Sequence, residues 1–545
     1  MRISICQYNP TVGAISKNKE AIINHILEAK REGADLVIFP ELALTGYPPE
    51  DLLLDLEFLN QAEQALLDCV KVSSGIAVLV GCIRPTLKEG AKPLYNSCAV
   101  IENGVLVGFQ DKALLPTYDV FDERRYFEPA KDEKIWTVAQ KRVGITICED
   151  IWAFSGEGEV PSYDHDPLCF FEQNHVDVLV NLSASPYAQG KNIKRRHVCE
   201  RAAKKSGAYF VMCNQVGAND ALLFDGRSSV FSESGKLLLE MAAFQEERVT
   251  FELESLKPIE KKEQAVEEEL FSALTMGLKD YFQKQGFQKA LVGLSGGIDS
   301  ALVASIATAA LGKEHVVGVL LPSRFTSCES TEDALYVAKN LGIATYEIPI
   351  EKIFQSTIDT LHPIFDNKPF DVTEENMQSR VRSLLLMALS NKSGALVLNT
   401  SNKSEFAVGY STLYGDTAGA ISVIGDLFKT EVYAVATWIM HHFGWIPPRV
   451  ITKAPSAELK GNQKDSDTLP EYHILDPILE DLIVHRLSPV EISKRRNVQM
   501  QLVEEIIRKI YKNEFKRRQC PFALRVSEKA FSVGRRVPIV QRFFS

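Results

Sequence analysis

The chain has 545 residues, of which 45% are hydrophobic and 24% charged, a composition typical of an ordinary globular protein. This length exceeds what one hydrophobic core spans, so we expect two to four domains. The formal net charge of −10 argues against non-specific binding to nucleic acid or to a membrane, and no apolar run reaches the roughly 18–20 residues of a membrane span.

Cysteine usage and the first residues bear on the compartment. The ten cysteines are scattered without a CxxC pair, which indicates neither a zinc site nor a disulfide framework. Residues 2–6 read as a strand and not as a signal peptide. We therefore expect reduced thiols in a cytoplasmic protein.

Strands and helices alternate along residues 1–255. Helical spacing of apolar residues predicts a helix at residues 17–32. Short apolar runs bounded by turn residues predict strands at 2–8, 35–41, 76–82, 97–101, 104–112, 142–148 and 176–182. Apolar strands of this kind, covered by helices, indicate an α/β layer architecture.

Three polar residues stand at the ends of these strands, namely Glu41, Lys112 and Cys148. Strand ends are where α/β folds place their chemistry. Singly, each has a structural explanation, as a helix cap, a solvated strand end or a buried small residue. Together they supply a thiolate that attacks a carboxamide, a carboxylate that moves the proton and an ammonium that stabilises the oxyanion. We also expect the lysine to keep the cysteine ionised.

The surrounding motifs carry a resemblance over this whole first half. They are FPEL at 39–42, TGY at 45–47, DK at 111–112, LP at 115–116, FDERRYF at 121–127, ICED at 147–150 and a tryptophan at 152. In order and spacing they resemble the nitrilase (carbon–nitrogen hydrolase) superfamily, which implies an α-β-β-α sandwich. The resemblance implies that Glu41 is the general base, Lys112 stabilises the oxyanion, Cys148 is the nucleophile and Glu123 is the second glutamate of the catalytic set.

A further run, NLSASPY at residues 181–187, follows an apolar strand and ends in a turn signal. It resembles the loop that borders the amide pocket in glutaminase members of the superfamily. Motif neighbourhood and this resemblance suggest a glutamine pocket made of Tyr118, Glu149, Ser183, Ser185 and Arg195. The basic stretch at 191–205 that contains Arg195 otherwise reads as a solvated helix face, because the net charge is acidic and aromatic interleaving is missing. An arginine from it could reach the glutamine carboxylate.

The charged, proline-containing segment at 256–269 is predicted to link a first domain, residues 1–255, to a second, residues 270–545. In the second domain we predict helices at 267–284, 298–310 and 330–341. Strands are predicted at 290–294, 315–321, 345–349 and 395–400. Repeated strand–helix units indicate a Rossmann-like parallel sheet.

The hexapeptide SGGIDS at 295–300 joins one of these strands to the next helix. Unpaired N–H groups and the helix dipole favour an anion at such a junction, and glycines let the backbone approach it closely. No lysine follows the glycines, so this is not the GxxxxGK[ST] loop, and Asp299 stands where a magnesium ligand could stand. SGGxDS is the motif of ATP pyrophosphatases, which hold the pyrophosphate of ATP while a substrate attacks the α-phosphate.

Later motifs extend the match. ENMQSRVR at 375–382, NTSNKSE at 399–405, GYSTLYGD at 409–416, GDLFKTEV at 425–432 and PSAEL at 455–459 resemble the synthetase domain of NAD synthetases. The resemblance implies that ATP is bound by Gly293, Ser295, Gly296, Gly297, Asp299, Ser300, Thr400 and Lys429. It implies that deamido-NAD is bound by Asn376, Arg380, Glu405 and Lys429.

The resemblance also implies a Mg²⁺ ion between Asp299 and Glu405, whose hard carboxylate oxygens suit that metal. Residues 455–470 resemble a mobile loop that closes over bound substrates. Ser-Asn-Lys-Ser at 401–404 departs from the Asp-His-Ala-Ala of many ammonia-only enzymes and fits the glutamine-using branch better. A homo-oligomer is implied as well.

An amidase joined to an adenylating domain predicts a two-step amidotransferase. Deamido-NAD would attack ATP to give an acyl-adenylate, and ammonia released from glutamine would then displace AMP. Two alternatives remain open: an ATP pyrophosphatase amidotransferase acting on a different carboxylate or nucleotide, and a regulatory binding protein with a degenerate site. The intact set Glu41, Lys112, Cys148, Asp299 and Glu405 argues against the second.

Overall fold

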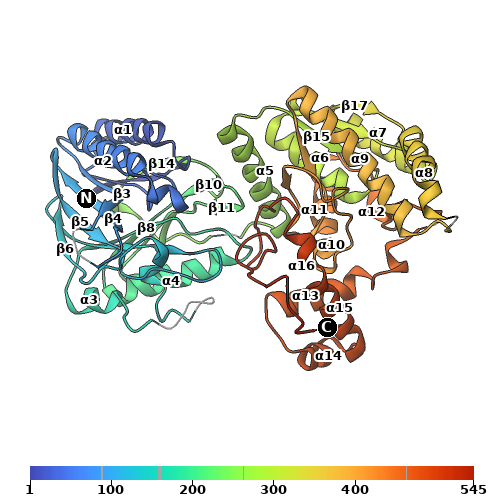
Figure 1. Cartoon of the computed structure of the whole chain (residues 1–545). Coiled ribbons are helices and arrows are strands. Elements are labelled where there is room, and N and C mark those ends of the chain that lie inside the picture. Colours follow the sequence, from blue (N-terminus) through green and yellow to red (C-terminus); the bar gives the residue numbers. More distant parts are fainter. Residues whose placement is uncertain (87–89, 157–162, 262, 367, 462, 545) are drawn as a thin grey trace. The chain divides into compact units, whose positions relative to one another are not determined.

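The computed structural model describes residues 1–86, 90–156, 163–261, 263–366, 368–461 and 463–544 (Figure 1). The contacts divide the chain into two compact units, Met1–Glu263 and Gln264–Ser545. This boundary falls inside the charged segment at 256–269. Within the described residues, no helix is both long enough and apolar enough to span a bilayer.

The first unit contains two six-stranded sheets. One has the order β14-β1-β2-β3-β4-β5 and the other β13-β12-β9-β8-β7-β6. The first sheet consists of β1 (Arg2–Gln7), β2 (Leu36–Ile38), β3 (Ala77–Pro85), β4 (Leu94–Glu102), β5 (Val105–Asp111) and β14 (Glu247–Glu252). The second consists of β6 (Ile135–Val138), β7 (Lys141–Ile147), β8 (Val178–Ser183), β9 (Tyr209–Asn214), β12 (Ser229–Phe231) and β13 (Leu237–Glu240). A hairpin of β10 (Val216–Asn219) and β11 (Leu222–Asp225) stands beside them.

The two sheets share one core, and helices cover their outer faces. Ile5 and Ile38 of one sheet belong to the same buried cluster as Ile145 and Val180 of the other. The outer helices are α1 (Ile15–Arg31) and α2 (Leu56–Val72) on one side and α3 (Leu168–Gln173) and α4 (Lys191–Ser206) on the other (Figure 1). The expected α-β-β-α sandwich is confirmed.

Short 3₁₀ turns complete the first unit: η1 (Glu50–Leu54), η2 (Glu123–Arg125), η3 (Cys148–Ile151) and η4 (Leu253–Ser255). The strand expected at 35–41 is shorter than predicted, since β2 ends before Pro40, which has no N–H to donate to a ladder. The strands β9 to β14 and β6 were not predicted individually.

The second unit is built on a five-stranded sheet of order β17-β16-β15-β18-β19, in which every pair is parallel, as expected. Its strands are β15 (Ala290–Gly293), β16 (Val316–Leu320), β17 (Ala344–Glu347), β18 (Leu396–Asn399) and β19 (Ile421–Ser422). From β15 the chain continues through β16 and β17 toward one edge of the sheet, and from β18 it continues to β19 at the other edge. The segments that follow these two strands therefore meet at the topological switch point, where open α/β sheets bind ligands.

Most helices of this unit lie about the sheet, whereas those from Tyr472 to Lys512 gather in a separate group with its own core (Figure 1). The helices are α5 (Val266–Gln285), α6 (Ile298–Leu311), α7 (Cys328–Leu341), α8 (Glu351–Phe365), α9 (Val372–Ser393), α10 (Lys403–Val408), α11 (Lys429–Phe443), α12 (Pro448–Thr452), α13 (Tyr472–Ile483), α14 (Pro489–Arg496), α15 (Met500–Lys512) and α16 (Glu514–Arg517). Two 3₁₀ turns are η5 (Lys313–His315) and η6 (Asp465–Asp467). The three helices predicted from periodicity, α5, α6 and α7, agree with the structure within two residues at each end.

Candidate active sites

Lys112 joins two buried carboxylates in the first unit. It directly follows β5, and its Nζ donates to Glu41 Oε1 at 2.7 Å and to Glu123 Oε1 at 2.8 Å. All three side chains are at most 5% exposed. Charge-assisted hydrogen bonds are short and strong where water is excluded. Glu41, Lys112 and Glu123, which the resemblance placed in one catalytic set, therefore form one cluster.

Further donors fix the two carboxylates. Asn96 Nδ2 donates to Glu41 Oε1 at 2.7 Å, and the backbone N–H of Ala184 donates to Glu41 Oε2 at 3.0 Å. The Tyr47 hydroxyl donates to Glu123 Oε1 at 2.9 Å. Sequence analysis gave Asn96 and Tyr47 no role, although Tyr47 closes the TGY motif. These contacts hold both carboxylates still and leave them only a few positions to occupy.

The turn that presents Cys148 is held by Asp150. Cys148 follows β7 as the first residue of η3, and its φ of 43° lies in the left-handed region. Asp150 accepts from the N–H groups of Ala113 and Leu114 at 3.0 and 2.8 Å and from that of Ile147 at 2.8 Å. One carboxylate thereby ties the residues after Lys112 to the residue before Cys148.

The pKa of Cys148 reflects its burial and the charges around it. Burial and the charge of Glu41 raise the pKa of the Cys148 thiol well above its ordinary value, whereas the charge of Lys112 lowers it. Lys112 therefore acts in the expected direction, because its charge favours the ionised thiol. A thiol whose pKa is raised needs a base before it can attack.

The lysine itself stays charged. Burial alone would lower the pKa of Lys112, but the negative charges of Glu123 and Glu41 outweigh it and raise that pKa. Burial also raises the pKa of Glu123 to about 7, against the opposing charge of Lys112. A fixed ammonium beside a cysteine is the arrangement that stabilises an oxyanion.

Glu149, next to Cys148 in the chain, is bound by two tyrosine hydroxyls. It accepts from Tyr118 at 3.0 Å and from Tyr163 at 2.9 Å. Ser183 and Ser185, at the end of β8 and just after it, are both buried. Ser183 Oγ donates to Asn181, and the N–H of Ser185 donates to Asn214. Tyr163 is a residue that sequence analysis missed.

The structure places Arg195 in a buried ion pair, in which its guanidinium lies 2.6 Å from Asp225. Lys191, from the same basic stretch, acts on Glu149, because its charge opposes the burial that raises the pKa of Glu149. The Lys191 Nζ also lies 5.7 Å from the centroid of the Trp152 ring. The expected contact of Arg195 with the glutamine carboxylate stays a prediction.

In the second unit, SGGIDS forms the turn between β15 and α6. The hydroxyls of Ser295 and Ser300 lie 3.2 Å apart, and Gly297 N donates to Ser295 Oγ at 3.2 Å. Gly296 has a φ of +79°, and a Cβ on it would lie 2.1 Å from the Ser330 carbonyl oxygen. Only glycine fits there. The turn opens into a pocket that is also lined by Thr400, from the segment after β18.

A carboxylate cluster lies at the same pocket. Lys429 Nζ forms a hydrogen bond with Asp299 Oδ2 and lies 3.7 Å from Glu405 Oε1. Asn402 Nδ2 donates to the other oxygen of Asp299 at 3.0 Å. Asp465, which also lines the pocket, accepts from Tyr472 at 2.9 Å. Sequence analysis assigned no role to Asp465.

This cluster contains more carboxyl groups than ammonium groups. Burial and the charge of Asp299 raise the pKa of Glu405 to about 8, and Lys429 opposes them. Burial raises the pKa of Asp465 as well. Glu405 would ionise more readily beside a further cation, and the oxygens of Asp299 and Glu405 are the donors that a hard divalent metal ion prefers.

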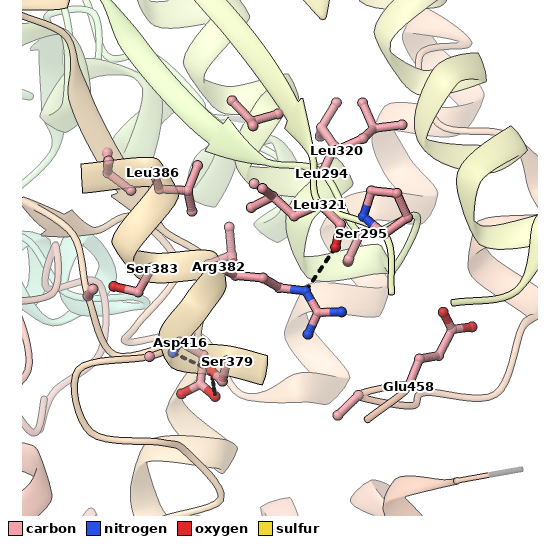
Figure 2. A pocket seen from close by; sticks show the side chains of 18 of the residues that line it. Leu294, Ser295, Leu320, Leu321, Ser379, Arg382, Ser383, Leu386, Asp416 and Glu458 are labelled. Atoms are coloured by element: carbon pink, nitrogen blue, oxygen red, sulfur yellow. Dashed lines mark hydrogen bonds between the residues drawn. The ribbon is translucent and has the colours of Figure 1, made fainter. Parts of the chain in front are cut away.

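A second cavity adjoins the turn, and Figure 2 shows its side chains. Arg382 of α9 reaches into it and donates to the Leu321 carbonyl oxygen at 3.0 Å. Burial lowers the pKa of Arg382 to about 10. Leu294, Leu320 and Leu386 supply apolar walls. Asp416 and Glu458 also line the cavity, which therefore combines apolar walls with a few charged groups, as ligand pockets commonly do.

Asn376 and Arg380 lie on α9 but contact another segment. Asn376 Oδ1 accepts from Thr412 Oγ1 at 2.7 Å, and Arg380 Nε donates to the Leu413 carbonyl at 3.2 Å. Ser379, between them, exchanges hydrogen bonds with Asp416 (Figure 2). Their expected contact with deamido-NAD stays a prediction.

The fold and the two clusters define the class of this protein: an amidase unit of the nitrilase type and an ATP-pyrophosphatase unit in one chain. The chain matches the carbon–nitrogen hydrolase family over residues 2–256 and the NAD synthase family over residues 270–520. It is 45% identical to a glutamine-dependent NAD(+) synthetase of Synechocystis sp., with 99% of each chain covered. It is 40% identical to one of Thermotoga maritima, over 100% of this chain and 99% of that one.

A solved structure agrees. The chain is similar to a glutamine-dependent NAD⁺ synthetase from Acinetobacter baumannii, solved with adenosine diphosphate, at 37% identity and a TM-score of 0.78. The match covers 99% of this chain and 98% of that one. The chain belongs to the glutamine-dependent NAD(+) synthetase family.

Proposed function

We propose that this protein transfers the amide nitrogen of glutamine to deamido-NAD at the expense of ATP, giving NAD, AMP, pyrophosphate and glutamate. The observation that carries the proposal is the Glu41–Lys112–Glu123 cluster beside Cys148, in a chain that also holds the Ser295–Ser300 turn. The first makes ammonia from an amide, and the second activates a carboxylate to receive it.

In the first unit, Glu41 takes the proton of the Cys148 thiol as its sulfur attacks the glutamine carboxamide. The charged Lys112 stabilises the oxyanion of the tetrahedral intermediate. Glu41 then gives the proton to the leaving nitrogen, and a thioester remains on Cys148. Glu41 next activates a water molecule that hydrolyses the thioester and releases glutamate. Glu123, which accepts a hydrogen bond from Lys112, holds the Lys112 ammonium group in place for both steps.

Two charged residues suit the polar end of glutamine. Glu149 would accept from its α-ammonium, with the Tyr118 hydroxyl beside it. Lys191 would face its α-carboxylate. A carboxylate and an ammonium together would recognise an amino acid over a simple amide. The N–H of Ser185 is already taken by Asn214, so any contact with glutamine would come from its hydroxyl.

In the second unit, the Ser295–Ser300 turn would hold the pyrophosphate of ATP, with Thr400 at its edge. Asp299 and Glu405 would hold Mg²⁺, which when bound neutralises phosphate charge. Lys429, now bonded to Asp299, would turn to the phosphates once a metal satisfies that carboxylate. The cavity around Arg382 would take the adenine ring. The deamido-NAD carboxylate then attacks the α-phosphate, and ammonia displaces AMP from the acyl-adenylate.

The proposal also includes the oligomeric state, the location and the roles of the two domains. Exposed apolar residues on α8 and α9, among them Ile364, Val372 and Leu384, support a homo-oligomer. All ten cysteines are free thiols, which supports a cytoplasmic location. Residues 1–255 and 270–545 would act as the glutaminase and synthetase domains, joined through 256–269.

The test is NAD formation from deamido-NAD, ATP and Mg²⁺ with glutamine or with ammonium as nitrogen donor. Cys148→Ala removes the nucleophile, so glutamine-dependent formation should fall by at least about 10³-fold while ammonium-dependent formation stays within about twofold of wild type. Cys169→Ala is the matched control, because it removes a less buried thiol of the same unit. Loss of both activities in Cys148→Ala would refute the division of labour.

A further inference from the structure

Four protein donors converge on the Glu458 carboxylate. It lies between α12 and η6, in the segment at 455–470, and has a φ of 49°. Its Oε1 accepts from Ser330 Oγ at 2.7 Å, from Ser327 Oγ at 3.0 Å and from Lys453 Nζ at 3.3 Å. Its Oε2 accepts from the N–H of Ser327 at 3.3 Å. A left-handed backbone at a residue other than glycine costs free energy, so these contacts must hold it there.

The donors form a cradle, which we define as Ser327, Ser330 and Lys453. Ser327 caps α7, a helix of 14 residues, so the helix dipole points at the same place. Lys453 also bonds Ser330 Oγ. Two hydroxyls, one backbone N–H and one ammonium converge on a single anion, which is the donor chemistry of a phosphate site.

The cradle is part of the wall around the SGGIDS turn. The carbonyl of Ser330 packs so closely against Gly296 that a Cβ there would lie 2.1 Å from its oxygen. Ser330, Lys453 and Glu458 line the same pocket as Ser295 and Asp299. The turn itself contains no cation, and a phosphate chain bound there would end close to Lys453.

We propose that the cradle is a phosphate subsite for the pyrophosphate end of ATP, and that the Glu458 carboxylate is its resident substitute, displaced when the nucleotide binds. The inference rests on the proposed function, because it needs a pyrophosphate-bearing substrate at the turn. Glu458 therefore competes with phosphate instead of helping to bind it.

Inorganic pyrophosphate is the probe, titrated calorimetrically into the full-length protein with Mg²⁺. Glu458→Gln keeps the shape of the side chain and removes its charge, so pyrophosphate should bind about fivefold more tightly than to wild type, because a competing anion is gone. Lys453→Met should weaken binding by about tenfold, because it removes the cation. Ser330→Ala should weaken it by about threefold without changing any charge.

Glu332→Gln is the matched control. It removes a carboxylate from the same helix, α7, at a side chain that is 66% exposed and pairs with Arg449. It should leave pyrophosphate affinity within about twofold of wild type, since an exposed charge is screened. An equal gain in this variant would mean that general charge, and not the cradle, sets the affinity, and would overturn the inference.

Unchanged or weaker pyrophosphate binding in Glu458→Gln would overturn the inference and assign Glu458 a part in holding the nucleotide. Unchanged binding in both Lys453→Met and Ser330→Ala would overturn it as well. ATP titration and NAD formation in wild type keep this separate from the proposed function. If wild type neither binds ATP nor forms NAD, both fail; if it does both, only the cradle is in question.

Discussion

At the scale of single residues, burial decides which form each reactive group takes. Burial and the charge of Glu41 raise the pKa of the Cys148 thiol well above its ordinary value. The charges of Glu123 and Glu41 raise the pKa of Lys112 against the effect of burial. In the proposed mechanism, proton transfer from the thiol therefore accompanies its attack on the amide.

Glu405 gives a stability prediction with a definite sign. Its pKa of about 8 in the folded protein lies above the ordinary value for glutamate, 4.5. Between these values the folded state holds a proton that the unfolded state has released, so stability falls as pH rises through this window. Glu405→Gln stays neutral throughout. It should raise the melting temperature at pH 8 by the equivalent of about 1 kcal/mol or more, with little gain near pH 5.

The measurement is thermal unfolding of both proteins from pH 5 to pH 8 in chelator, so that no divalent ion holds Glu405 ionised. Glu505→Gln, at an exposed position on α15, is the control and should show no pH-dependent difference. A constant difference between Glu405→Gln and wild type across this range would mean that Glu405 does not titrate there.

The sequence identified the reactive residues but not the residues that bind them. Glu41, Lys112, Cys148, Asp299 and Glu405 each stand in a short motif after a strand, which periodicity reveals. The donor to Glu41 from Ala184 is 143 residues away, and no local pattern encodes it. The ion pair of Arg195 was not anticipated for a related reason, because its partner Asp225 lies on a distant hairpin strand.

At the scale of elements, Asp150 connects two strands by their ends. It fastens the chain after β5 to the chain after β7, and so sets the separation of Lys112 from Cys148. Burial raises its pKa to about 7, although three backbone N–H groups favour the ionised form. A buried acceptor with three donors is costly to change, because each donor left unpaired costs about 1–3 kcal/mol.

Asp150→Asn should therefore damage the first unit and spare the second. An amide has one acceptor oxygen, so at least one of the three N–H groups faces an NH₂ group instead. We expect glutamine-dependent NAD formation to fall by about 10²-fold, since small displacements in a catalytic cluster cost that much. Ammonium-dependent formation should stay near wild type. A fall in both, or in neither, would show that this tie does not position the cluster.

Element prediction succeeded where periodicity was strong. The strands β7 and β8 and the helix α6 were read from apolar runs, because parallel strands and central helices are apolar throughout. The β1–β14 pair was not anticipated. Arg2 pairs with Glu252, and antiparallel pairing across such a separation leaves no mark in a window of ten residues.

At the scale of the whole molecule, two chemistries occur in one chain. Free ammonia is mostly protonated at neutral pH, and ammonium is not a nucleophile. Producing it on the same chain that consumes it raises its local concentration. Under the proposed function, the first unit would need only glutamine and water, whereas the second would need ATP, deamido-NAD and Mg²⁺. We therefore expect each chemistry to be removable without the other.

Asp299→Asn should remove the chemistry of the second unit and leave that of the first. Its carboxylate bonds Lys429 and Asn402, and an amide there would weaken both the metal and the lysine contact. NAD formation should fall by at least about 10²-fold with either nitrogen donor, because phosphate charge is no longer neutralised. Glutamine hydrolysis, followed as glutamate release in the absence of ATP, should remain within about threefold of wild type. Normal ammonium-dependent turnover in Asp299→Asn would remove the metal role of this carboxylate, and loss of glutamine hydrolysis would show that the two sites depend on each other even without ATP.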